Sequence, residues 1–182
     1  MVAQSLDSLR KRAFYPCCAD DVDEPRRLLA GVVEEIIYCD LRCPRRWIQQ
    51  ESSGSLPAIR LIQGDVREHI DSLPTIHVLF YRRDSPGEGG SGVYILGKQW
   101  LSRVLQRFPD EGGLIITDGS NSGNSIFKKM IRPDGYIRKS WQCQFWPSRE
   151  QPWLETYSLH RIEMKRLTQQ SGGADGVTAA HP

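Results

Sequence analysis

Carboxylates, cysteines and arginines follow directly on several apolar segments of this 182-residue chain. The stretch "FYPCCADD" (14–21) places two cysteines and two aspartates after an aromatic pair. Asp40 ends the run "EEIIYCD", Asp65 follows "AIRLIQG", and Arg82, Arg83 and Asp84 follow "TIHVLFY". Carboxylates accept hydrogen bonds from sugar hydroxyls, arginines bind anions, and cysteines act as nucleophiles or metal ligands. The question is whether the fold brings these groups to one place.

The segments that carry these residues alternate between strand-like and helix-like patterns. A helix is expected from Asp23 or Glu24, ahead of Pro25, because acidic residues and proline favour a first helical turn. The remaining expected helices are 66–73, 94–108 and 126–131, and the expected strands are 13–16, 34–42, 58–65, 75–83 and 114–119. Two longer strands, 136–146 and 153–166, are expected to form an antiparallel pair joined by the turn 147–152.

This alternation predicts an α/β fold: a doubly wound, mostly parallel sheet of about seven strands with an antiparallel C-terminal pair. Ligands bind such sheets beyond the carboxyl ends of the strands. The turn 17–21, Asp40, Asp65 and the end of the fourth strand should therefore share one rim. For Asp65 and Asp118, a helix N-cap is the alternative role.

Composition and charge set few limits on function. The 24 basic and 22 acidic residues give a net charge of +2, which neither requires nor excludes a nucleic-acid partner. No apolar run approaches the roughly 20 residues of a membrane span. We expect a cytoplasmic protein with reduced cysteines, a single domain over residues 1–167 and a disordered tail over 168–182.

The cysteines allow two further interpretations. Cys17, Cys18, Cys39 and Cys43 could together bind zinc, but adjacent cysteines chelate poorly, so buried free thiols and no metal site are expected. A cysteine nucleophile needs a nearby base, and no histidine is spaced to serve Cys17. Neither chemistry is favoured.

Two other features have a functional and a structural interpretation. The loop "SPGEGGSG" (85–92) could bind an anion through its amides, or serve as a lid or connector. Trp141, Phe145, Trp146 and Trp153, interleaved with basic residues, could stack on single-stranded nucleic acid. Packing at the edge of the sheet is the favoured interpretation of these aromatics, so nucleic acid stays possible but not favoured.

Over about Ala13 to Arg166 the chain resembles the class I S-adenosylmethionine-dependent methyltransferases, which have a Rossmann-like fold. "AFYPCCADD" stands where that family has its glycine-rich first motif, and "IIYCD" resembles the strand that ends in the ribose-binding acid. "IRLIQGDVREHIDSLP" resembles the third motif, and "FPDEGGLIITDG" resembles the family's fifth strand with its preceding turn. The resemblance implies S-adenosylmethionine as the cofactor and methyl transfer to an unknown acceptor as the activity.

The resemblance also implies roles for particular residues. Asp40 would bind the ribose, Asp65 and Val66 would lie near the adenine, and the turn 17–20 would lie beside the methionine part. The expected cofactor-binding residues are Tyr15, Cys17, Cys18, Asp20, Asp40, Asp65 and Val66. Arg82 and Arg83 are the expected substrate-binding residues, and Asp84 is the candidate general base. Because the first motif lacks glycine, a binding or regulatory protein that has lost the cofactor is the alternative.

Overall fold

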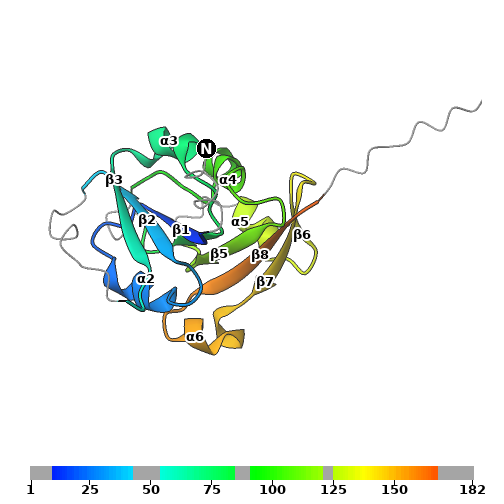
Figure 1. Ribbon diagram of the computed structural model, residues 1–182. Coiled ribbons are helices and arrows are strands. Elements are labelled where there is room, and N and C mark those ends of the chain that lie inside the picture. The colour runs from blue at the N-terminus through cyan, green and yellow to red at the C-terminus, as the bar shows by residue number, and fades with distance from the viewer. Residues whose placement is uncertain (1–9, 43–53, 85–90, 121–124, 168–182) are drawn as a thin grey trace, which may run out of the picture.

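The computed structural model describes residues 10–42, 54–84, 91–120 and 125–167, and these residues build an eight-stranded sheet (Figure 1). The strand order is β3-β2-β1-β4-β5-β8-β7-β6. The strands are β1 (Arg12–Pro16), β2 (Glu35–Asp40), β3 (Ala58–Gln63), β4 (Val78–Tyr81), β5 (Gly113–Thr117), β6 (Gly135–Ile137), β7 (Trp141–Trp146) and β8 (His160–Arg166).

The first five strands run parallel, and the last three are antiparallel to their neighbours. Since β1 pairs with β2 on one side and with β4 on the other, the order of the chain reverses at β1. The region between the carboxyl ends of β1 and β4 is therefore the switch point at which doubly wound sheets bind ligands. The predicted α/β fold is confirmed.

Helices cover both faces of the sheet (Figure 1). On one face lie α3 (Val66–His69), α4 (Lys98–Leu105) and α5 (Ser125–Met130), and on the other lie α2 (Asp23–Leu28) and α6 (Pro152–Glu155). The short 3-10 turns η2 (Ile70–Ser72) and η4 (Ser148–Glu150) complete the described helical elements. The strands alternate accordingly: Phe14 packs into the core under α3 and α4, whereas Tyr15 packs into the core on the α2 side.

The C-terminal part differs in detail from the expectation. The predicted strand 136–146 is split into β6 and β7 by a turn at 138–140, which raises the strand count to eight. Residues 153–155 belong to α6 and not to a strand, because Pro152 at the first helical position favours a helix there. The antiparallel pair is still present, formed by β7 and β8.

Several expectations lie partly or wholly outside the described residues, namely the tail 168–182, Cys43 and most of the loop 85–92. Among the described helices, none is long and apolar enough to cross a membrane.

Candidate functional site

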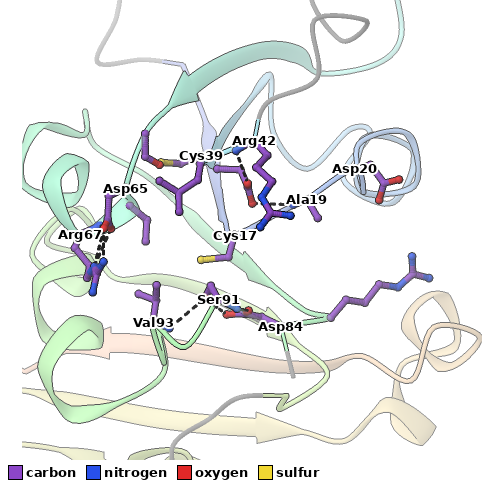
Figure 2. Close-up of a pocket in the computed structure, with 15 residues that line it drawn as sticks. Cys17, Ala19, Asp20, Cys39, Arg42, Asp65, Arg67, Asp84, Ser91 and Val93 are labelled. Carbon is purple, nitrogen blue, oxygen red and sulfur yellow. Dashed lines mark hydrogen bonds and ion pairs between the residues drawn. The ribbon is translucent and has the colours of Figure 1, made fainter. Parts of the chain in front are cut away.

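A pocket of about 460 Å³ opens at the carboxyl ends of β1 to β4, at the switch point of the sheet (Figure 2). Its wall is built from four segments: the turn after β1, the end of β2, the start of α3 and the chain that follows β4. The residues that both the sequence predicted and the structure places in this wall are Cys17, Asp20, Asp40, Asp65, Val66, Arg83 and Asp84.

The turn after β1 has an unusual backbone. Cys17 and Ala19 have φ angles of 56° and 47°, in the left-handed region that favours glycine. Two hydrogen bonds to β2 hold it: the Cys17 amide donates to the Cys39 carbonyl at 2.8 Å, and the Ala19 amide donates to Asp40 Oδ2 at 3.0 Å. The backbone therefore has a glycine-like conformation although Cβ atoms are present.

The Asp40 carboxylate holds the backbone on two sides. Oδ2 accepts from Ala19, and Oδ1 accepts the amide of Arg42 at 2.8 Å. Asp40 also lines the pocket, and carboxylate oxygens can accept hydrogen bonds from hydroxyl groups of a ligand.

Asp65 begins α3 and confirms the N-cap alternative, because its side chain accepts the amide of Arg67 at 2.9 Å. The same carboxylate also receives the Arg67 guanidinium, with Nε 2.8 Å from Oδ1. The side-chain hydrogen bonds from Arg67, followed by the backbone one, lower the pKa of Asp65 to about 2. Val66, 3 % exposed, adds apolar surface beside this ion pair.

The Cys17 thiol points into the centre of the pocket (Figure 2). Burial, together with the charges of Asp84 and Asp40, raises the pKa of Cys17 to about 12 although a hydrogen bond with Ser91 opposes the shift. The thiol is therefore protonated near neutral pH and is a poor nucleophile.

Asp84 also lines the pocket and is 2 % exposed. Its Oδ2 accepts the Tyr81 hydroxyl at 2.5 Å and the Ser91 hydroxyl at 2.7 Å, and its Oδ1 accepts the Ser91 amide. Its own amide donates to Ser120 Oγ at 3.2 Å. This carboxylate thus connects the end of β4 to the chain that returns at Ser91.

Three predicted residues lie outside the pocket wall. Cys18 is 1 % exposed in the core on the α2 side, and the Tyr15 ring packs in the same core. Arg82, 2 % exposed, is paired with Asp21, so its guanidinium is not presented to the pocket. Arg83, the next residue, does line the pocket, and its amide donates to Asp118 Oδ2 at 3.0 Å.

Sequence reasoning missed several residues of the wall, among them Gly64, Arg67, Ser91 and Val93. Gly64 and Arg67 flank Asp65, so their proximity to it was a usable signal. Ser91 and Val93 follow a segment without periodicity, and nothing in their local sequence points to the site.

The C-terminal aromatics pack mainly against the protein. Trp141 is buried, makes an edge-on contact with Phe108 at 6.1 Å and lies under Arg166 at 4.8 Å. Phe145 packs on the core and near His160. Trp153, by contrast, is 41 % exposed. The packing interpretation therefore fits Trp141 and Phe145.

No family model and no curated protein matches this chain. Among solved structures it is similar to a methyltransferase from Geobacter sulfurreducens, with 13 % identity, 91 % of this chain and 75 % of that chain covered, and a TM-score of 0.52. It is also similar to a chain of a fibrillarin/Nop5p complex, with 11 % identity, 91 % and 79 % coverage and a TM-score of 0.51. Identities this low show the fold alone. The chain has the fold of the class I S-adenosylmethionine-dependent methyltransferases.

Proposed function

We propose that this protein binds S-adenosylmethionine in the pocket and is a methyltransferase whose acceptor is unknown. The observation that carries the proposal is the joint position of Asp40 and Asp65 in one pocket at the switch point of a methyltransferase-type sheet. Fold alone does not determine activity, so the proposal depends on the groups in this pocket.

The pocket has the groups that a nucleoside requires. The Asp40 carboxylate lines the pocket and can accept hydrogen bonds from ribose hydroxyls, and Val66 offers an apolar surface to a base. Asp65 and Arg67 add a polar edge beside Val66. The volume of about 460 Å³ lies within the range of small-molecule sites.

The cofactor supplies an electrophilic sulfonium methyl group when bound. Methyl transfer depends chiefly on holding the methyl group and the acceptor in line, so the task of this chain is orientation and exclusion of water. We propose that Asp40 and Val66 hold the nucleoside, that Cys17 and Asp20 lie beside the amino-acid part, and that Arg83 contacts the acceptor. The role of Asp84 as general base stays a prediction; its three hydrogen bonds from Tyr81 and Ser91 fix its orientation.

The second candidate function is a binding or regulatory protein without methyl transfer. The side chains at Cys17 and Ala19 favour it, because their Cβ atoms occupy space that glycine would leave to a ligand. Binding and transfer must therefore be measured separately.

The expected cytoplasmic location also stays a prediction.

Isothermal titration calorimetry with S-adenosylmethionine and S-adenosylhomocysteine tests the proposal. We expect one site per chain, and we expect Asp40→Asn to weaken binding about 10- to 100-fold, because one charge-assisted hydrogen bond is worth roughly 1.5–3 kcal/mol. Asp110→Asn is the matched control, since Asp110 has a side chain 94 % exposed and does not line the pocket. Absence of heat at millimolar ligand contradicts cofactor binding, and binding without transfer to any tested acceptor supports the second candidate.

A further inference from the structure

The turn after β1 keeps a backbone conformation that its residues do not favour. Cys17 and Ala19 both have positive φ angles, and non-glycine residues adopt such angles only where the surroundings hold them. The two hydrogen bonds to β2 hold the start of the turn. Its end, at Asp21, is held by a separate group.

That group is the guanidinium of Arg82, which reaches Asp21 from the end of β4. Nε donates to Asp21 Oδ2 and Nη2 to Oδ1, both at 2.7 Å, so the contact is bidentate. Nη2 also donates to Glu24, in the first turn of α2. The Tyr15 hydroxyl, 2.7 Å from Asp21 Oδ2, donates to the same carboxylate.

The Arg82 guanidinium also lies near two aromatic rings. Its guanidinium lies 5.5 Å from the Phe80 ring centroid and 6.0 Å from that of Tyr157. Burial disfavours its charge, but the hydrogen bonds and charge of Asp21, followed by those of Glu24, outweigh this effect and raise the pKa of Arg82. The contact therefore persists at every pH at which the protein is folded with these carboxylates ionised.

A backbone hydrogen bond links Asp21 to the turn beside the pocket. The Asp21 amide donates to the Cys18 carbonyl at 2.9 Å, so a shift of Asp21 moves the peptide between the two strained residues. We propose that Arg82 is a positioning residue: by clamping Asp21 and Glu24 to β4, it keeps the glycine-free turn in the conformation that shapes the pocket. The inference rests on the proposed function only in treating this pocket as the ligand site.

The Cys17 thiol gives a readout that needs no ligand. We would measure alkylation of each cysteine by N-ethylmaleimide at pH 8, resolved by peptide mass spectrometry, in the full chain and in Arg82→Lys, which keeps the charge but loses the bidentate contact. Cys143, which is buried and does not line the pocket, reports opening of the whole fold. Arg103→Lys is the matched control, because Arg103 also contacts one aspartate, Asp71, through Nε and Nη2, but on the surface.

The clamp predicts that Arg82→Lys speeds alkylation of Cys17 at least tenfold and leaves the rate at Cys143 unchanged, and that Arg103→Lys changes neither rate. Adding Ala19→Gly to Arg82→Lys should return the Cys17 rate to within about threefold of the original chain, since glycine adopts the left-handed conformation without help. An unchanged Cys17 rate in Arg82→Lys, an equal rise at Cys17 and Cys143, or a double variant as reactive as Arg82→Lys alone would overturn the proposal.

Ligand binding separates this inference from the proposed function. If S-adenosylhomocysteine binds, Arg82→Lys should weaken its affinity at least fivefold, and Ala19→Gly should restore most of that loss. If it does not bind to the original chain, the proposed function fails, whereas the alkylation rates still decide whether Arg82 holds the turn.

Discussion

The Ala19 amide lies 3.0 Å from Asp40 Oδ2 and donates a hydrogen bond to it, which joins the turn after β1 to the end of β2. One carboxylate thus fixes a strained backbone and also faces the pocket. The same groups that hold the turn therefore determine the space left for a ligand.

Ala19→Gly should stabilise the protein by about 0.5–1 kcal/mol. Relief of the left-handed penalty, about 1–2 kcal/mol, exceeds the entropic cost of glycine in the unfolded chain, about 0.4–1 kcal/mol. Ala19 is exposed, so little packing is lost. Urea denaturation measures the change. Ala58→Gly in β3, where φ is not positive, is the control and should destabilise by about 0.5–1 kcal/mol; an equal loss at Ala19 would contradict strain in the turn.

Alkylation of Cys17 should keep rising with pH well above pH 9. Burial raises its pKa from the ordinary 9.0 to about 12, so its thiolate fraction grows about tenfold per pH unit between pH 8 and 10. A small-molecule thiol measured in parallel, with a pKa near 8.5–9, levels off in that range. A Cys17 rate that levels off near pH 9 would show that the thiol is not buried in the pocket wall.

Arg67→Ala should raise the pKa of Asp65 from about 2 toward its ordinary value of 3.8. The rise should be incomplete, because the backbone hydrogen bond from residue 67 remains. A depressed folded-state pKa gives stability that is present above pH 3.8 and is lost as the pH falls toward 2, so the variant should lose less stability in this window. Carbon-13 NMR titration of the Asp65 carboxyl checks the shift, and an unchanged pKa would contradict the ion pair.

Asp84→Asn should destabilise the protein by about 1.5–3 kcal/mol, because the charged acceptor of three hydrogen bonds is replaced by a neutral group. Tyr81→Phe, which removes one donor, should cost about 1 kcal/mol and leave the carboxylate in place. Once an acceptor is known, transfer rates distinguish the roles of Asp84. Loss of transfer in Asp84→Asn, with activity retained in Tyr81→Phe, supports a base, whereas equal losses in both indicate a role in positioning alone.

The strand ends were readable from the sequence, and with them Asp40 and Asp65. Short apolar runs and a polar residue at each end are local signals, and parallel packing then brings the ends together. The separation of Cys17 from Cys18 was not accessible in this way. Alternation along β1 would place Cys17 with Tyr15 and Cys18 with Phe14, but the structure has the reverse, because the extended strand ends at the positive φ of Cys17.

Other features have no local signal. Arg82 and Arg83 are adjacent arginines at a strand end, and both guanidinium groups lie near Asp21 and Glu24. Only the fold buries the first in a bidentate contact with Asp21 and leaves the second exposed at the pocket. The positive φ angles of Cys17 and Ala19 run against their residue types, so local propensity predicts the opposite backbone. Long-range contacts, which sequence patterns do not reveal, determine both.

Protection of Cys17 by S-adenosylhomocysteine tests most directly whether a nucleoside cofactor occupies this pocket. With saturating ligand at pH 8, we expect alkylation of Cys17 by N-ethylmaleimide to slow at least tenfold, and we expect alkylation of Cys143, which lies outside the pocket wall, to be unchanged. A Cys17 rate that millimolar S-adenosylhomocysteine leaves unchanged would contradict it.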